Sequence, residues 1–434
     1  MKKLYIIPAI CLTLLLSGCM GSEPNDIAYI VAMGFDTAEY NNYKITLQFA
    51  KPTQISGGAS EEGGKGGDIV ENVTVEAPNI YSGINIANNI VSKKLSMSHE
   101  KLMIFSEEVA SNGLNDIMET LSKSYEVRPD MYLAVSKSEA GEFLNSVKPV
   151  IEVNPAKYYQ LTFEESGGIG IPKNIAQDFY FCKNRLYKDG ILPLAGVIGT
   201  NEEEKSNNQE NEENQENSDE SSISDKTENN NQIIPPLNEN GFEFKLKDYI
   251  AGTVGIKETN KSEAMGMALF KEGKLVGTMG GIESELYNIL NGSFDYGYIS
   301  FYSKKSPQTP IAVKLQQKKK PKIKVDVKEK KVDINLYLEA DLFSLPDNYA
   351  TEKDITSFEN ESKNSIKKAC EKFLNETINE YNVDILGIIK KAKRNYLTYE
   401  EFEKQDWSSA FSDYEINVNP NFYIRRAGMT IREN

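Results

Sequence analysis

Apolar and polar residues follow regular patterns in the first third of the chain, and these patterns predict strands that alternate with helices. Residues 43–49 alternate with period two, which is typical of a strand with one solvent-facing side. Residues 102–105 are a continuous apolar run, as expected of a buried central strand. After Asn79, Ile80, Ile84 and Ala87 recur at helical spacing, which predicts a capped helix. An α/β arrangement is therefore expected for residues 26–150.

The last third of the chain predicts a second sheet and one long helix. Residues 299–302, 311–315, 323–327 and 332–338 alternate in polarity, which indicates an antiparallel or mixed sheet. Around Pro420, residues 416–424 predict a final pair of strands bent at the proline. Between these segments, apolar and small residues recur every three or four positions and form one face of a surface helix. This face comprises Ile355, Phe358, Ile366, Ala369, Phe373, Thr377 and Tyr381.

Together these patterns indicate an α/β (α+β) fold, and the chain is long enough for two or three domains. We expect an N-terminal domain at 26–150, a middle domain at 151–295 and a C-terminal domain at 296–434. The middle domain carries an acidic insertion, 201–236, in which residues 201–232 hold 11 acidic residues and two lysines, a net charge of −9. So polar a segment buries too little apolar area to offset its ordering entropy, so we expect it to be disordered.

The N-terminus has the pattern of a cleaved signal peptide. Two lysines precede a short apolar segment that ends in Leu16-Ser17-Gly18-Cys19. The apolar run is shorter than the roughly 20 residues that a membrane span needs. The sequence Leu-Ser-Gly-Cys resembles a bacterial lipobox, which implies a signal peptide at 1–18 and an acylated Cys19 on the outer face of a membrane. Residues 19–25 would then form a lipidated tether, and five extended residues of it reach only about 17 Å.

Composition limits the kinds of function that the chain can have. The chain has 434 residues and a net charge of −15, which argues against nucleic-acid binding by an exported protein. His99 is the only histidine, and no hydrolase, zinc or Cys-x-x-Cys motif is present, so we expect no cofactor, no metal and no catalytic residues. His99 is interpreted as a structural residue at a turn. Cys182 and Cys370 either pair or are buried free thiols, and the spacing favours free thiols.

A basic run, Lys318-Lys319-Lys320, has two possible interpretations. Clustered lysines can bind the headgroups of anionic lipids. Three lysines in succession are also typical of a solvated turn between strands, and this interpretation is favoured because the cluster is short.

Several motifs resemble the Ger(x)C family, the lipoprotein C-subunits of spore germinant receptors. They are Val383-Asp384-Ile385-Leu386-Gly387, Asp406-Trp407, Ile416-Asn417-Val418-Asn419-Pro420, Ile424-Arg425-Arg426-Ala427-Gly428, Ser98 to Phe105 with Val127 to Asp130, and Gly266 to Phe270 with Lys274 to Gly277. The family usually has a Trp-Asp pair soon after the lipid cysteine, whereas this chain has Met20-Gly21-Ser22. The acidic segment 201–232 is also absent from the common pattern.

This resemblance implies three domains, each with a central mixed or antiparallel sheet flanked by helices. It also implies a non-enzymatic subunit that acts in germination beside a multi-pass A-subunit and a transporter-like B-subunit, on the outer face of the spore inner membrane. Only Cys19 is carried over as a functional residue. Two other functions stay open, a solute-binding lipoprotein of an envelope transport system and an envelope hydrolase of unrecognised type. A binding protein would need two similar lobes, and the two halves show no repeat.

Overall fold

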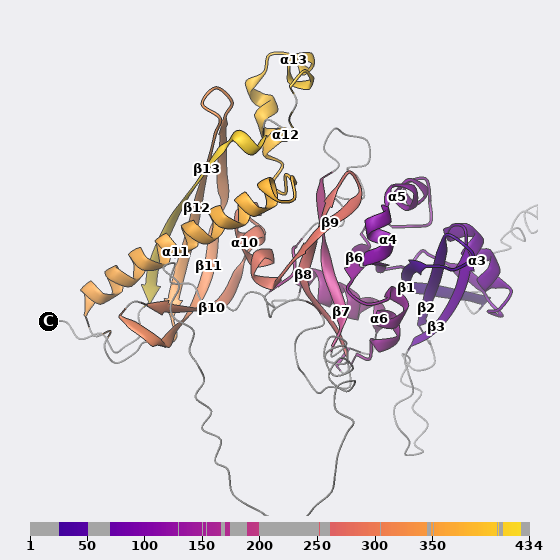
Figure 1. The fold of residues 1–434 in the computed structure, drawn as a ribbon. Helices are drawn as coiled ribbons and strands as arrows, with labels where there is room; N and C mark the ends of the chain where they lie inside the picture. Colours follow the sequence, from indigo (N-terminus) through magenta and orange to yellow (C-terminus); the bar gives the residue numbers. More distant parts are fainter. Residues whose placement is uncertain are drawn as a thin grey trace, which may run out of the picture.

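The computed structural model has an α+β fold with mixed sheets flanked by helices, which confirms the predicted fold class (Figure 1). The long helix α11 crosses one sheet, and the shorter helices α3 to α6 lie around the other. The structure describes residues 26–50, 70–128, 130–149, 151–152, 154–165, 170–173, 189–198, 251, 261–303, 305–344, 349, 351–405, 407 and 411–426.

The first sheet has nine strands in the order β3-β2-β1-β5-β6-β7-β8-β9, with β4 beside β1. Strands β1, β5, β6 and β7 run parallel to one another, and the outer strands are antiparallel to their neighbours, so the sheet is mixed. The strands are β1 Ile27–Thr37, β2 Tyr43–Ala50, β3 Val70–Ala77, β4 Lys94–Ser96, β5 Leu102–Ser106, β6 Tyr132–Ser136, β7 Gly190–Val197, β8 Ser262–Lys271 and β9 Lys274–Met279.

Helices cover both faces of this sheet, which explains why its central strands are apolar on both sides. One core joins Met103 and Phe105 of β5 to helices α3 Ile80–Asn88, α4 Glu107–Asn112 and α5 Asn115–Ser122. The opposite core joins Leu102 and Ile104 to α6 Ala140–Ser146 and α7 Pro155–Gln160, which continues as the π-helical turn η2 Leu161–Glu165. The continuous apolar run at 102–105 is therefore a buried central strand, as predicted.

Local capping explains several helix starts. Asn79 accepts a hydrogen bond from the Ser82 N–H at α3, and Asn154 precedes Pro155 at α7, as the sequence predicts. Helix α6 has no side-chain cap from its own N-cap residue, Glu139. Instead the carboxylate of Asp36 in β1 accepts the N–H groups of Ala140 and Gly141, at 2.6 and 2.9 Å. A cap supplied by a strand 104 residues away leaves no local sequence signal.

The second sheet has four strands in the order β10-β11-β12-β13. Only β12 and β13 are parallel. Helix α11 Glu352–Asn379 packs on one face, α10 Gly281–Asn291 lies between the two sheets, and four short helical elements follow α11 among the described residues. The remaining elements are β10 Tyr296–Ser303, β11 Ser306–Asp326, β12 Lys331–Leu342, β13 Glu415–Arg426, α12 Ile388–Ala392, η4 Lys393–Asn395, α13 Tyr399–Glu403 and η5 Phe411–Asp413.

Two expectations about strands are wrong. The predicted final pair at 416–424 is one strand, β13, because Pro420 lies on an edge strand, where a missing N–H does not interrupt the ladder. Helix α11 covers the free edge of β13, because its Glu371 and Glu359 accept the N–H groups of Val418 and Ile424. The two predicted strands at 311–315 and 323–327 are also one strand, β11, whose pairing shifts at irregularities between them.

The number of sheets also differs from the prediction. Three domains with a sheet each were expected, but the described strands of 151–295 continue the first sheet, since β7 pairs with β6. The reason is that β7 is buried along its length and needs a strand on each side. One core cluster contains residues of β8, α10 and all four strands of the second sheet, so the two sheets share apolar packing. The domain boundaries at 150 and 295 stay predictions.

Candidate functional site

The sequence-predicted functional residue, Cys19, lies outside the described residues, as do the signal peptide 1–18 and the tether 19–25. The first described strand, β1, starts at Ile27 and lies inside the nine-stranded sheet, with β2 on one side and β5 on the other. Within the described part of the chain, no helix is both long enough and apolar enough to span a bilayer.

His99 occupies a turn between β4 and β5, where it was expected. Its ring packs edge-on against Tyr29 at a centroid distance of 4.3 Å, and its Nδ1 lies 3.1 Å from the Ser98 hydroxyl. The turn is fixed to the sheet because the Lys101 N–H donates to Val31 and the Lys101 carbonyl accepts from Tyr132. Over the described ranges, no three His, Cys, Asp or Glu residues are grouped so that they could hold a metal ion.

The neighbouring Glu100 is the unusual group of this turn. It is 1% exposed, and neither carboxylate oxygen has a hydrogen-bond partner. Burial raises the pKa of Glu100 from 4.5 to about 8, so the folded protein keeps this carboxyl protonated at neutral pH. With no hydrogen-bond partner for either oxygen, Glu100 is a buried titratable group.

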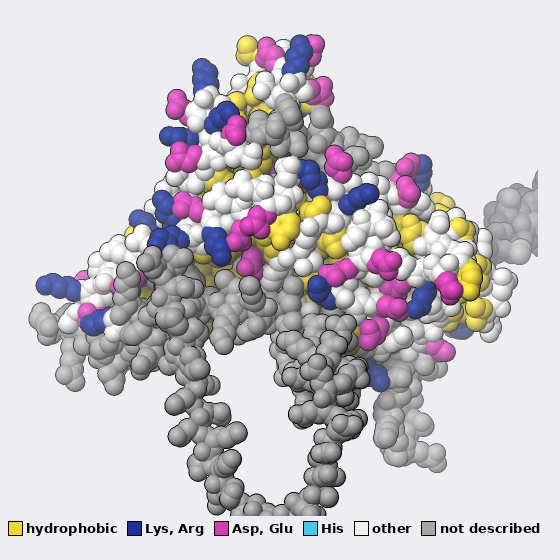
Figure 2. All heavy atoms as spheres, in the orientation of Figure 1, with side chains coloured by type: hydrophobic (Ala, Val, Ile, Leu, Met, Phe, Trp, Pro, Cys, Tyr) yellow, Lys and Arg dark blue, Asp and Glu magenta, His cyan; other side chains and the backbone are white. Residues whose placement is uncertain are grey.

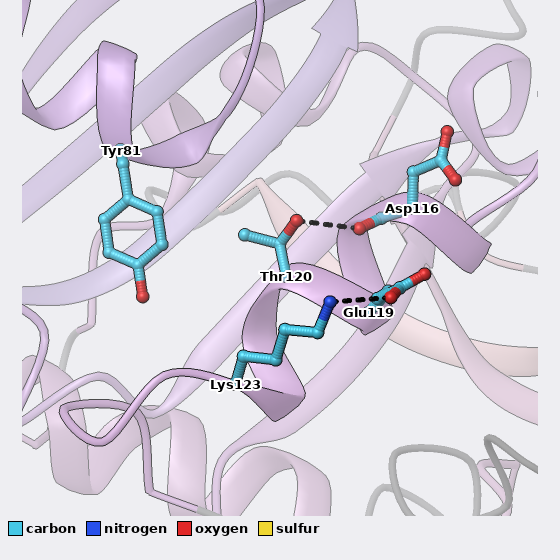
Figure 3. A pocket seen from close by; sticks show the side chains of 5 residues that line it. All are labelled: Tyr81, Asp116, Glu119, Thr120 and Lys123. Atoms are coloured by element: carbon cyan, nitrogen blue, oxygen red, sulfur yellow. Dashed lines mark hydrogen bonds and ion pairs between the residues drawn. The ribbon is translucent and has the colours of Figure 1, made fainter.

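A polar hollow of about 390 Å³ lies between α3 and α5 (Figure 3). Tyr81 lines one side, and α5 with its C-terminal end lines the other. Figure 3 shows that Lys123 reaches back to Glu119, at 2.7 Å, and that the Thr120 hydroxyl donates to the carbonyl of Asp116, at 2.9 Å. These groups bond within their own helix, so the hollow presents no set of side chains that converge on a ligand.

A second, largely apolar cavity of about 300 Å³ lies where α10 meets β10 and α11. Glu285 is the one charged residue among its described lining residues. One Glu285 oxygen accepts the Gly170 N–H at 3.1 Å and the other has no partner, while burial raises the pKa of this carboxyl to about 7. The cavity is large enough for a small apolar molecule, which bears on the solute-binding alternative.

The Asp-Ile-Leu-Gly motif begins at a contact between the two sheets. We call this contact the inter-sheet joint and define it by six residues: Asp189, Lys271, Gly277, Tyr381, Asn382 and Asp384. The part-buried Asp384 carboxylate accepts the N–H groups of Ile388 and Ile389, each at 2.8 Å, so it caps the start of α12. Burial raises its pKa to about 6. Its own N–H donates to Asp189, ahead of β7, and Lys271 of β8 donates to Asn382. Gly277 of β9 lies so close to the Tyr381 ring that an added Cβ would overlap it.

Trp407, of the Asp406-Trp407 motif, is half-buried at the edge of the core that the two sheets share. Its Nε1–H donates to the Phe402 carbonyl at 3.0 Å, and its ring lies against Tyr396, Phe402 and Tyr414. Cys370 is a buried free thiol, as favoured, whereas Cys182 lies outside the described residues. Figure 2 shows acidic and basic side chains intermingled over the visible face, with hydrophobic side chains in small groups.

Comparison with known proteins gives two domain matches. Residues 21–197 match the domain described as "Spore germination protein N-terminal domain", and residues 265–428 match "Spore germination B3/ GerAC like, C-terminal". The first match includes β1 to β7 and the second includes most of β8 and all later described elements. Together they include the Ser98 to Phe105 motif and all residues of the inter-sheet joint. Neither match includes the acidic insertion 201–236, which lies outside the described residues.

Individual relatives are similar over part of the chain. "Spore germination protein KC" of Bacillus subtilis (strain 168) is 28% identical over 157 residues, 35% of this chain and 38% of that protein. "Spore germination protein YndF" of the same organism is 25% identical over 210 residues, 45% of this chain and 50% of that protein. The chain thus spans half or less of the length of these curated relatives. A solved structure, "Crystal Structure of the GerBC protein", aligns with 91% of this chain and 98% of that one, at 14% identity and a TM-score of 0.46.

Proposed function

Because this chain belongs to the spore germination protein family with its GerAC-like C-terminal domain, we propose that it is a lipoprotein subunit of a nutrient germinant receptor. The observation that carries the proposal is the family match over both halves of the chain. The proposed partners are a multi-pass A-subunit and a transporter-like B-subunit, and the proposed location is the outer face of the spore inner membrane.

Within that complex we propose a non-enzymatic role, as scaffold or signal coupler. The inter-sheet joint supports this role, because hydrogen bonds tie the segment between α11 and α12 to the first sheet: the Asp384 N–H donates to Asp189, just before β7, and Lys271 of β8 donates to Asn382. We propose that the packed and hydrogen-bonded groups of this joint couple the position of one sheet to that of the other.

Deleting the gene tests the receptor proposal. Spores that lack the protein should lose their response to one class of nutrient, because the receptor for that class is incomplete. They should still germinate when the step downstream of the receptor is triggered directly. The measurement is loss of spore refractility after addition of each nutrient. Normal germination with every nutrient, in a strain without a second receptor of the same specificity, would contradict the proposal.

The anchor has its own test, Cys19→Ala. A lipoprotein cysteine carries at least two acyl chains, and each buried methylene adds about 0.8 kcal/mol to membrane binding, so the anchor should be lasting. The variant should lose acylation and be uncleaved or released. Labelling with a clickable fatty acid measures this, and Cys370→Ala is a matched control, since that thiol is buried and should leave the label unchanged. Label retained on the Cys19 variant would refute the anchor.

The second candidate, a solute-binding lipoprotein, is favoured by one observation, the apolar cavity beside Glu285. A ligand at 100 times its Kd stabilises the folded state by about 2.7 kcal/mol. A rise in Tm of that order with a nutrient, abolished by Ile289→Trp, which fills the cavity, would favour this candidate. Absence of any rise would favour the scaffold role.

A further inference from the structure

A cleft of about 660 Å³ separates strand β11 from the α12–η4 segment. Lys320 and Lys324 of β11 line one wall, and Lys391 and Arg394 line the other. Apolar side chains, among them Ile323 and Leu386, also line it. Figure 1 shows α12 beside the β11–β12 hairpin, and the Asn395 side chain fixes the two walls by donating to the carbonyl of Val325 at 3.2 Å.

Most of the basic side chains that line this cleft have no ion-pair or hydrogen-bond partner among the described residues. Lys320, Lys324 and Arg394 are without an ion pair or side-chain hydrogen bond to any other described residue. Lys391 differs, because its Nζ donates to the Leu386 carbonyl and burial lowers its pKa. The four cations face two carboxylates, so the cleft keeps a net positive charge in a chain of net charge −15.

The two carboxylates of the cleft, Asp326 and Asp333, both belong to the β11–β12 hairpin. Asp326 accepts the N–H groups of Lys328 and Glu329 in the hairpin turn. Asp333 lies directly across the ladder from Lys324. Further lysines adjoin the lining residues in the sequence, namely Lys318, Lys319 and Lys322 on β11 and Lys390 and Lys393 beside Lys391 and Arg394.

Exposed apolar groups lie next to these cations. Leu397 is 95% exposed and Tyr399 is 48% exposed, both just beyond Arg394. The Lys393 ammonium lies over the Tyr399 ring, 4.3 Å from its centroid. Basic residues beside an exposed leucine and tyrosine are typical of surfaces that lie in the headgroup region of a bilayer. A free phosphate would give no reason for the exposed Leu397.

We propose that this cleft binds the phosphate headgroup of an anionic phospholipid, with Leu397 and Tyr399 inserted at the bilayer surface. The inference rests on the proposed function in one respect, because the acyl anchor at Cys19 would make a bilayer the nearest anionic surface. The protein then contacts the membrane at two points, the tether and the C-terminal half. Two points of contact restrict its orientation, which a tether alone does not.

The test uses the chain from Met20 onward, which keeps every described residue and lacks the acylated cysteine. Its binding is measured by co-sedimentation with vesicles of phosphatidylcholine containing about one third phosphatidylglycerol. The chain should bind these vesicles, release at high salt and not bind pure phosphatidylcholine. The variant K320Q/K324Q/R394Q should bind about 100-fold more weakly, since each cation near an anionic surface contributes about five-fold.

The matched control is K93Q/K353Q/K363Q, which removes the same charge from exposed lysines outside the cleft. It should bind within a few-fold of the unaltered chain, and both triple variants should keep the same Tm. L397S should weaken vesicle binding without altering the salt dependence. If the two triple variants lost the same amount of vesicle binding, net charge alone would explain the effect, and the proposal would be overturned. No binding by the unaltered chain would also overturn it.

Two further experiments distinguish the lipid headgroup from other possible ligands of the cleft. Glycerol 1-phosphate at millimolar concentration should not displace the protein from vesicles; full displacement would make the cleft a site for a free phosphate compound and overturn the lipid assignment. Binding to an acidic protein partner in place of vesicles would do the same. The vesicle result is independent of the germination test, because it uses neither the acyl chains nor the receptor partners, so failure of one leaves the other standing.

Discussion

Replacing Phe358 with alanine should lower the free energy of unfolding by about 3–5 kcal/mol. Phe358 lies on α11, is 1% exposed and packs edge-on against Phe301 of β10, at a centroid distance of 5.8 Å, and Tyr349, at 6.1 Å. The substitution removes this ring from the core between α11 and the second sheet and leaves a cavity that close-packed neighbours fill only in part. Urea unfolding followed by circular dichroism measures the loss.

Phe343→Ala is the matched control, because it makes the same chemical change at a ring that is 63% exposed. It should cost less than about 1 kcal/mol, as is usual for surface substitutions. If the two variants lost similar stability, the tight packing of α11 on the sheet would not be the source of the Phe358 effect.

Helix α11 is also where sequence reasoning succeeds most fully. Phe358, Ile366 and Phe373 were predicted on one helical face, and all three are buried against the sheet. A helix of 28 residues repeats its apolar spacing many times, so its face is determined locally. The continuous apolar strand at 102–105 was predictable for a similar reason, since a strand covered on both faces cannot be polar on either.

Strand pairing was much less predictable, because alternation identifies a strand but not its neighbours. Nothing local in residues 190–197 indicates that β7 continues the first sheet beside β6. The same limit applies to the inter-sheet joint. The motif that contains Asp384 was identified in the sequence, but its partner Asp189 is 195 residues away, so the joint appears only in the folded chain.

Glu100 illustrates the limit for candidate sites. It lies in Ser98-His99-Glu100-Lys101, a polar stretch at a turn, where a carboxylate is ordinarily exposed. No period or motif marks it as buried. The one indirect signal is that the turn leads straight into the apolar strand β5, so a side chain at its end can be drawn into the interior.

The Glu100→Gln variant should be more stable than the unaltered protein by about 3–5 kcal/mol at pH 8.5, and of equal stability near pH 4. The pKa of Glu100 is about 8 in the folded protein against an ordinary value of 4.5, because burial penalises the charged form. Below pH 4.5 both folded and unfolded chains hold the proton. As the pH rises towards 8, only the unfolded chain releases it, so the free energy of unfolding of the unaltered protein falls.

Glutamine has the same shape and cannot ionise, so the free energy of unfolding of the variant does not fall through this residue as the pH rises. The difference in free energy of unfolding between the two proteins therefore measures the effect of ionising Glu100. Other buried carboxyls, including Glu285 and Asp384, also have raised pKa values, but they titrate in both proteins and cancel in the difference. Glu142→Gln, at an exposed position, should show no such growth with pH. Urea unfolding at several pH values between 4 and 9 provides the measurement. Parallel stability curves for Glu100→Gln and the unaltered protein would mean that Glu100 is hydrated or paired in solution, and the turn before β5 would then be open rather than sealed.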